Sequence, residues 1–252
     1  MKKILPAIMA ALLLTGSAFA AELVGEYVEA EGIAYNEGQA LGALRRIAIM
    51  DAYRYLAEQV DAIYVTANST VKNVRDLDET INTKVETALR GAKVISVTRE
   101  RDGSFHAIVR MPAYGSSQSL ASAVLKENVV VEDFPPPKVV NMVSVSCTGL
   151  IIDCRGMGLS QAIAPAIKSV DGTEVYAYKN VGYQNAVSRG MIDYSTSVDS
   201  GVERAGSSPL VIKAVNVSGG CDVVVSAGDA DKILSANQST HFLNNSAVVF
   251  VR

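Results

Sequence analysis

The sequence predicts an α+β fold with two small sandwich-type domains joined by a proline-rich linker. Amphipathic helical segments and strand-sized apolar runs occur together in both halves. Asp-Gly pairs at 102–103 and 171–172 separate strand-like segments, which is typical of hairpin turns. Consecutive prolines at 135–137 exclude regular structure and favour an extended connection. We therefore expect domains over residues 21–132 and 139–252, with the linker at 133–138.

The first twenty residues have the composition of a cleaved secretory signal. A basic start at residues 2–3 precedes an apolar run over 4–14, and Ala-Phe-Ala at 18–20 fits the pattern that signal peptidase reads. We expect cleavage between Ala20 and Ala21, and no cysteine stands there to carry a lipid. The later apolar runs are strand-sized, so no transmembrane span is expected in the mature chain. The sequence predicts a periplasmic or secreted protein.

The first domain is predicted to begin with a strand and a long helix. Residues 23–35 alternate apolar and polar positions, as a half-buried strand does. Asn36 and Gln39 resemble a capping box that opens a helix running to about Val60. Residues 62–72 are ambiguous between strand and loop. The apolar face of the helix comprises Leu41, Leu44, Ala48, Ala52, Tyr55, Leu56 and Val60.

A second helix and a hairpin complete this domain. The helix is expected to end near Gly91, a residue type common at helix C-termini. Hairpin strands at 93–99 and 104–111 follow, and residues 116–127 form a short helix or helical turn. Helices that cover one face of a sheet give an α+β sandwich. The second helix is marked by apolar residues at steps of three and four: Val74, Leu77, Ile81, Val85 and Leu89.

The second domain is predicted to be richer in strands. Its Gly- and Ser-rich residues 181–208 are expected to form an irregular excursion with one helical turn. The closing strand either completes the second sheet, which we favour, or pairs across a subunit boundary. The other expected elements are strands at 139–153, 166–170, 173–178, 210–217, 222–226 and 248–252, with a helix at 229–236 capped near Ser226 or Asp229.

The three cysteines, Cys147, Cys154 and Cys221, permit one disulfide in an oxidising compartment. The separation of Cys147 and Cys154 is odd, so one continuous strand would place them on opposite faces, roughly 23 Å apart at about 3.3 Å per residue. A bond from Cys221 to Cys147 or Cys154 is therefore expected. The alternative is three small buried thiols.

The motifs that would indicate an enzyme are incomplete. The glycines at 156 and 158 lack the third glycine of a dinucleotide loop, because Gln161 stands there. Ser160 lacks the second glycine of a nucleophile elbow. The histidines, His106 and His241, are each expected to be structural or exposed. We therefore predict no catalytic residue and expect that the protein is not an enzyme.

No metal or cofactor site is expected either. Asp229 and Asp231 supply only two carboxylates, and acidic residues at a helix start are the simpler explanation. The cysteines have no CxxC or histidine spacing of the kind that binds zinc. Asp153 and Arg155 flank Cys154 on one strand face, and we expect them to form an ion pair, with partner binding as the alternative role.

The charge balance excludes nucleic acid as a partner. Removing Lys2 and Lys3 from the 23 basic residues leaves 21 against 26 acidic ones. A mildly acidic chain without a basic cluster is unsuited to phosphate backbones.

The chain resembles a family of bacterial envelope proteins. The Glu31-Gly32 strand, the Ala-rich helix 40–60 and the Gly91-Ala92 hairpin start look like the N-terminal domain of the flagellar assembly protein FlgT and of FlgP-like outer-membrane lipoproteins. The resemblance implies a non-enzymatic protein that forms or supports rings around the flagellar rod. In the first domain it rests on Arg46, Ala48, Asp51, Ala52 and Leu56, and in the second on residues 148–153, Pro165, Gly172, Val175-Tyr176 and 209–215.

We therefore expect a periplasmic structural or assembly protein with envelope proteins, flagellar ring components or further copies of itself as partners. No cofactor is expected. The alternative is a periplasmic module that binds a small molecule or peptidoglycan. Its pocket would lie between the domains near the linker or under the excursion at 181–208.

Overall fold

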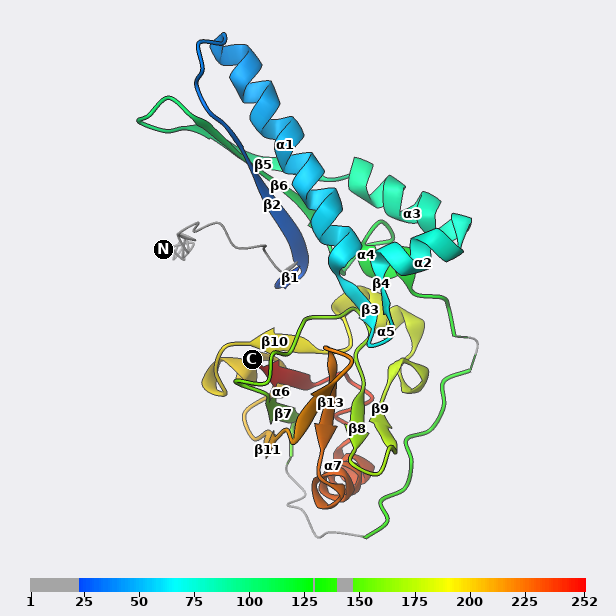
Figure 1. Cartoon of the computed structure of the whole chain (residues 1–252). Coiled ribbons are helices and arrows are strands. Elements are labelled where there is room, and N and C mark those ends of the chain that lie inside the picture. Colours follow the sequence, from blue (N-terminus) through cyan, green and yellow to red (C-terminus); the bar gives the residue numbers. More distant parts are fainter. Residues whose placement is uncertain (1–22, 129, 140–146) are drawn as a thin grey trace, which may run out of the picture.

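The computed structural model describes residues 23–128, 130–139 and 147–252. An N-terminal domain and a C-terminal domain, each containing helices and sheets, are stacked end to end (Figure 1). The predicted α+β class is confirmed. The predicted signal segment, with its cleavage site at Ala20 and Ala21, lies outside the described residues, as does part of the strand predicted at 139–153.

The N-terminal domain is built on a four-stranded antiparallel sheet in the order β1-β2-β6-β5. β1 (Leu23–Val24) and β2 (Tyr27–Ala34) form a tight hairpin. β5 (Lys93–Arg99) and β6 (Phe105–Pro112) form the hairpin predicted around Asp102-Gly103. Buried and more exposed residues alternate along β2 and β6, so one face of the sheet is covered and the other is open to solvent.

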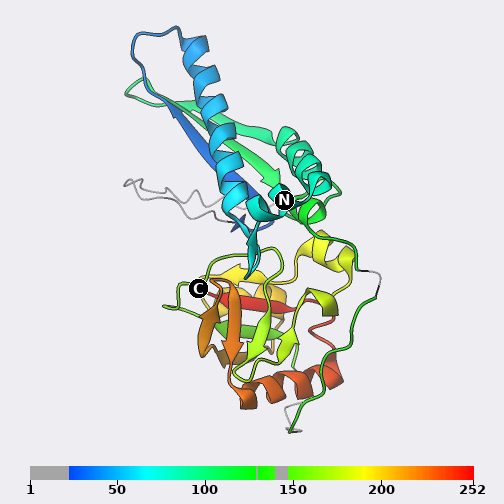
Figure 2. The same ribbon diagram turned by 45° about the vertical axis from the view of Figure 1, so that its right-hand side comes forward.

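Helix α1 (Leu41–Ala62) covers that face and runs along β2 and β6 (Figures 1 and 2). Two residues of its predicted apolar face are exposed instead, Leu41 at 49% and Tyr55 at 40%, because the helix touches the sheet through a narrower stripe. That stripe consists of small and medium side chains: Leu44, Ala48, Ala52, Leu56 and Val60.

The predicted capping box at the start of α1 is wrong. Ala40 is the N-cap residue, and no side chain caps the helix there. Asn36 Oδ1 accepts a hydrogen bond from the Gly38 N–H, and Gln39 Oε1 accepts one from the Glu37 N–H. Both side chains therefore close local turns in the loop before the helix, a competing use of such polar residues.

The helix and the sheet approach most closely at Gly32 on β2. A Cβ atom at this position would lie 2.1 Å from Ala52 N and 2.3 Å from Ala48 O. The backbone of α1 thus rests directly on the backbone of β2. Only glycine in the strand, with alanine in the helix, permits this distance.

The second predicted helix is interrupted. α2 (Val71–Leu77) and α3 (Glu79–Arg90) are separate because Asp78 Oδ1 accepts from Thr80 N and Ile81 N and so begins a new helix. Leu77 was predicted to lie on the apolar face of the helix, and it is 88% exposed as a result. Residues 62–72 contain a small hairpin, β3 (Tyr64–Thr66) and β4 (Ser69–Thr70), and α4 (Leu120–Val124) ends the domain.

The described residues of the C-terminal domain form two four-stranded sheets. The first, in the order β10-β14-β7-β11, is entirely parallel. The closing strand β14 lies inside it between β10 and β7, so the favoured prediction that it completes this domain's sheet is confirmed. The second sheet, β12-β13-β8-β9, includes the predicted Asp-Gly hairpin between β8 and β9. The strands are β7 (Leu150–Asp153), β8 (Ile167–Ser169), β9 (Glu174–Tyr176), β10 (Asp193–Ser195), β11 (Leu210–Lys213), β12 (Asn216–Ser218), β13 (Asp222–Val225) and β14 (Val248–Val251).

The excursion at 181–208 is more regular than predicted. It holds α5 (Tyr183–Arg189), strand β10, a 3-10 turn η2 (Asp199–Gly201) and α6 (Val202–Ala205). A further 3-10 turn, η1 (Tyr178–Asn180), precedes it. Helix α7 (Ala227–Thr240) is longer than the predicted 229–236, and Ser226 is its N-cap.

We expect Gly32→Ala to lower the free energy of unfolding by about 3 kcal/mol, because the new methyl group would overlap the backbone of α1. Gly42→Ala is the matched control, since nothing lies within 4 Å of a Cβ at that position near the start of α1. That control should be neutral or stabilising by up to about 1 kcal/mol. Urea denaturation of both variants measures the difference, and equal midpoints would contradict the proposed contact.

Candidate functional site

The segment that was predicted as a linker is fastened along the C-terminal domain. Residues 131–138 contain neither helix nor strand, as the prolines require. The Glu132 N–H donates to Lys179 O over 2.8 Å, and the buried Asn180 amide donates to the carbonyls of Glu132 and Asp133. Phe134 stacks on Tyr176 with ring centroids 6.2 Å apart. The connection is a strap that follows the second domain.

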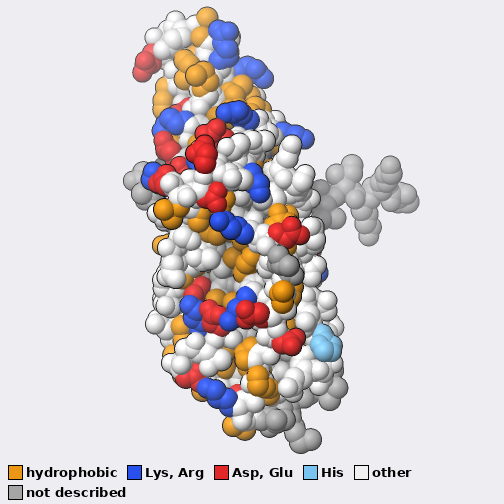
Figure 3. Space-filling view, turned by 90° about the vertical axis from the view of Figure 1, so that its right-hand side faces the viewer, with side chains coloured by type: hydrophobic (Ala, Val, Ile, Leu, Met, Phe, Trp, Pro, Cys, Tyr) orange, Lys and Arg blue, Asp and Glu red, His pale blue; other side chains and the backbone are white. Residues whose placement is uncertain are grey.

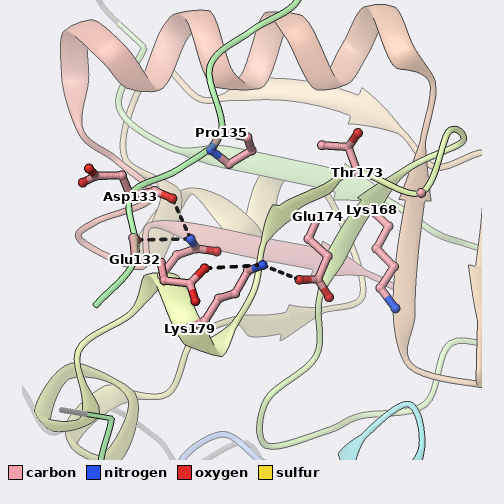
Figure 4. A pocket seen from close by; sticks show the side chains of 9 residues that line it. Glu132, Asp133, Pro135, Lys168, Thr173, Glu174 and Lys179 are labelled. Carbon is pink, nitrogen blue, oxygen red and sulfur yellow. Dashed lines mark hydrogen bonds and ion pairs between the residues drawn. The ribbon is translucent and has the colours of Figure 1, made fainter. Parts of the chain in front are cut away.

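A charged hollow of about 690 Å³ lies between this strap and the β8–β9 hairpin (Figure 4). Lys179 Nζ stands between two carboxylates, 2.9 Å from Glu174 Oε2 and 3.6 Å from Glu132 Oε2. The hydrogen bond to Glu174 raises the pKa of Lys179. Lys168 Nζ is 2.7 Å from Asp222 Oδ2. Acidic and basic side chains gather together on this part of the surface (Figure 3).

These ion pairs explain what the hollow does. Both lysines that line it are already paired with carboxylates of the same chain, so their charges are neutralised. At the lower end of the strap, Lys138 Nζ pairs with Asp171 Oδ2, and the Lys138 N–H donates to Asp231 Oδ1 over 2.7 Å. We interpret the hollow as the place where the strap is held to the domain.

The two domains are joined at several further points. The Ile163 and Ala164 N–H groups donate to the carbonyls of Tyr64 and Val65, so hairpin β3–β4 pairs with the C-terminal domain. Gln161 Nε2 donates to Leu23 O over 3.0 Å, and its Oε1 accepts from the Leu23 N–H. The end of α1 and the start of β1 are therefore both fixed to the second domain.

A second hollow of about 500 Å³ lies at this junction between α3 and α5. Its lining includes Tyr183 and Lys84 together with several serine and threonine side chains. The Gly115 N–H donates to Val187 O beside it, over 2.9 Å. This hollow lies between the domains and next to residues 181–208. A pocket in this place is what the alternative prediction, a binding module, requires.

The N-terminal sheet has long open edges. β5 forms one edge over seven residues. On the other side, β1 pairs only with Tyr27 and Val28, and no other described strand pairs with that side of β2 from Glu29 to Ala34. The edge strands of the C-terminal sheets have three or four residues each. Backbone groups at such edges are available to another strand.

The sheet face that lacks a helix is lined with charged pairs. Glu29 pairs with Arg110, whose guanidinium lies 4.7 Å from the centroid of the Tyr27 ring. His106 Nδ1 is 2.7 Å from Glu31 Oε1. His106 is thus a partly exposed surface residue that is hydrogen-bonded to Glu31. His241 lies in the other domain, where it caps α7 with φ of 54°.

The predicted ion pair between Asp153 and Arg155 is confirmed. Arg155 donates from Nη2 to Asp153 Oδ2 over 2.7 Å and from Nε to Oδ1 over 2.9 Å. This hydrogen bonding lowers the pKa of Asp153 to about 2. The pair stands at the end of β7, and its role in partner binding stays a prediction.

The three cysteines are free thiols in the structure, so the bond expected from Cys221 to Cys147 or Cys154 is not formed in it. Each is buried, and each thiol faces an oxygen of its own neighbourhood: Cys147 Sγ lies 3.2 Å from Gly149 O, and Cys154 Sγ lies 3.6 Å from Ile152 O. This is the arrangement of the buried-thiol alternative.

The acidic residues of α7 also have local partners. Asp229 accepts from Lys232 and from the Ser226 hydroxyl, as expected for the first turn of a helix. Asp231 accepts from the strap at Lys138. Within residues 23–128, 130–139 and 147–252 no three His, Cys, Asp or Glu side chains are grouped as metal ligands would be. No helix in the same ranges has the length and apolar composition needed to cross a membrane.

Comparison with protein families finds a match to the C-terminal domain. Residues 149–252 match the family model described as the second domain of Treponema pallidum Tp0624. The match covers the C-terminal domain from the start of β7 onward, which is less than half of the chain. No curated protein matches the chain. Because the match concerns this domain alone, the resemblance to FlgT and FlgP stays a prediction.

The residues that join the parts of the molecule were missed by the sequence analysis. Gln161 was considered only as the residue that spoils a glycine motif, yet it binds β1 from 138 positions away. Asn128 and Asn180, which hold the strap, sit in segments without periodicity. A buried asparagine in an irregular segment leaves no pattern in the sequence, because its partners are backbone atoms.

We expect acid to release the lower end of the strap. The hydrogen bond from Lys138 lowers the pKa of the Asp171 carboxyl well below its ordinary value of 3.8. The pair therefore stabilises the attached strap fully above that pH, and its contribution falls progressively as the pH drops below 3.8 towards the lower pKa of the attached state. Nitrogen-15 relaxation of the Lys138 amide should report an ordered backbone at pH 6 and a more mobile one at pH 2.5, where part of this stabilisation is lost. In Lys138→Met, residue 138 should already be more mobile at pH 6, and identical relaxation of the wild-type amide at both values would contradict the assignment.

We also expect three reactive thiols in the denatured, unreduced protein. Burial raises the pKa of Cys154 and of Cys221 to about 12, so few thiolates form in the folded protein, and it should react with a disulfide reagent at least tenfold more slowly. Colorimetric titration with such a reagent, with and without guanidinium, measures both quantities. A single thiol in the denatured sample would instead mean that a disulfide forms.

Proposed function

We propose that this chain is a non-enzymatic structural or assembly protein of the bacterial cell envelope, delivered to the periplasm by its N-terminal signal. Its proposed partners are envelope proteins, with the ring components of the flagellar basal body as the specific expectation. Delivery to the periplasm rests on the sequence of residues 1–20, and the flagellar partners rest on the FlgT and FlgP resemblance. The assembly role rests on the geometry of the described residues.

One observation carries the proposal: two of the three longest described strands, β2 and β5, have open edges, on a domain that is fixed to a second one. β2 and β5 have eight and seven residues and expose backbone groups that another strand could pair with. The junction through Tyr64, Val65 and Gln161 holds these edges in a defined orientation. A fixed orientation is what a repeating assembly needs.

The charged hollow supports the same conclusion. Its lysines pair with carboxylates that belong to the strap and the domain, so its polar groups contribute to internal attachment. The Glu29–Arg110 ion pair and the Glu31–His106 hydrogen bond on the open sheet face are likewise internal.

A binding module is the second candidate, and the hollow of about 500 Å³ at the domain junction favours it. Hydroxyl and amide side chains beside Tyr183 would suit a glycan or a peptide. A ligand at about 100 times its Kd would add roughly 2.7 kcal/mol to the free energy of unfolding. A thermal-shift screen with muropeptides tests this, and the absence of any shift over a broad panel would dispose of it.

We expect the mature chain, residues 21–252, to form multimers and to be present in hook–basal-body complexes from its native host. Size-exclusion light scattering measures the first property, and quantitative mass spectrometry of the purified complexes measures the second. Near-stoichiometric recovery with the ring components would support the flagellar proposal. A monomer at high concentration that is also missing from the complexes would overturn the assembly function.

A further inference from the structure

The charges at the two open edges of the N-terminal sheet differ in sign. The free length of β2 carries Glu29 and Glu31, and Asp51 of α1 reaches the same edge, where it accepts from the Ile33 N–H over 3.4 Å. β5 carries Lys93 and Arg99 and has no acidic residue. Among the described residues neither of these cations has an ion-pair partner, whereas Glu29 and Glu31 lie on a face shared with Arg110 and His106.

The register across the sheet shows where a charge is missing. Glu29 on β2 lies opposite Arg110 on β6, and Arg110 lies opposite Lys93 on β5. Arg110 and Lys93 are thus neighbouring cations in one row across the sheet, and the acidic residue of that row, Glu29, lies on the far side of Arg110 from Lys93. Like charges directly opposite each other are unfavourable, and an acidic residue beyond Lys93 would relieve them.

The helix layer is incomplete at the same edge. α1 lies over β2 and β6 and has little contact with β5. Val94 faces the helix side, because it is opposite the buried Val109, yet it remains 39% exposed. Its neighbour Ile95 is 48% exposed at an irregularity in the strand. A second helix beside α1 would cover Val94.

We propose that copies of this chain associate head to tail, with β5 of one copy beside the free edge of β2 of the next. The inference rests on the proposed assembly function and names the partner, a second copy, and the two edges. β2 and β5 are both antiparallel to β6, so they are parallel to each other, and the next copy would continue the sheet in the same direction. In unchanged register, Lys93 lies beside Glu29 of the neighbouring copy, and the neighbour's α1 lies over Val94.

The charges also decide against symmetric pairing. Two β5 edges in contact would bring together two strands that carry cations and no acidic residue, and two β2 edges would bring acidic residues together. Lys93 and the irregularity at residue 95 are the kind of feature that blocks unspecific pairing at an edge. A head-to-tail contact joins different surfaces, so it extends to a ring or a filament.

Cysteine cross-linking tests the arrangement. Ser96 on β5 is opposite Ile108, which is opposite Glu31 on β2, so these positions share one row. In the mature chain, Glu31→Cys with Ser96→Cys should give a ladder of dimers, trimers and larger species after mild oxidation. Each single variant should stay monomeric on a non-reducing gel, which also controls for the three native thiols. A mixture of the two single variants should give dimers only.

A charge reversal supplies an independent readout. Lys93→Glu should weaken self-association at least tenfold in sedimentation equilibrium, because it places an acid beside Glu29 of the neighbour. Lys213→Glu is the matched control, since this exposed lysine lies on β11, an edge strand of the other domain, and should leave association unchanged.

Each outcome decides between the alternatives. The ladder together with the loss in Lys93→Glu supports head-to-tail pairing. Dimers from Ser96→Cys alone, or an effect of Lys213→Glu equal to that of Lys93→Glu, overturn it. Multimers that give no ladder overturn the edge contact and leave the assembly function intact. A monomer that is recovered in basal bodies has the same two consequences. A monomer that gives no ladder and is missing from basal bodies overturns both.

Discussion

The close contact between helix α1 and strand β2 at Gly32 is the constraint on which the rest of the molecule depends. It brings two backbones together where a single methyl group would not fit. Because α1 is set on the sheet in this way, the hairpin that follows its last turn points at the second domain and pairs there through Tyr64 and Val65. The same placement puts α1 over β2 and β6 and leaves β5 uncovered. The junction and the open edge are therefore two results of one packing contact.

The charged and polar side chains fall into two groups: those that bind other parts of the same chain, and those at the β5 edge that have no ion-pair partner among the described residues. The strap, the hollow and the junction use lysines and asparagines whose partners are carboxylates or carbonyls of the same chain. Surface ion pairs of this kind contribute little individually, so the strap depends on several of them together with backbone hydrogen bonds. At the edge of β5, by contrast, Lys93 and Arg99 lack such partners among the described residues. This difference separates internal attachment from a surface that is suited to a partner.

Periodicity in the sequence was enough to predict the fold class, the long helix and both Asp-Gly hairpins. It failed where a polar side chain changes the course of the backbone. Asp78 interrupts a continuous apolar pattern by capping a new helix, and Asn36 closes a turn before α1 instead of capping it. The junction could not be predicted, because Gln161 binds β1 through backbone atoms that leave no trace in composition. The open edges also depend on strand order, which periodicity does not specify.

The C-terminal domain has its own backbone contact of the same kind. At Gly149 a Cβ atom would lie 2.4 Å from Ala205 O and 2.6 Å from Ala247 O, so α6 and the approach to β14 are pressed against the start of β7. The match to the second domain of Tp0624 begins at this residue and includes both sheets. Both four-stranded sheets of the described C-terminal domain therefore lie within the matched region. The open edges and their opposite charges lie outside the matched region, so any assembly built on them has to be explained from this chain's own residues.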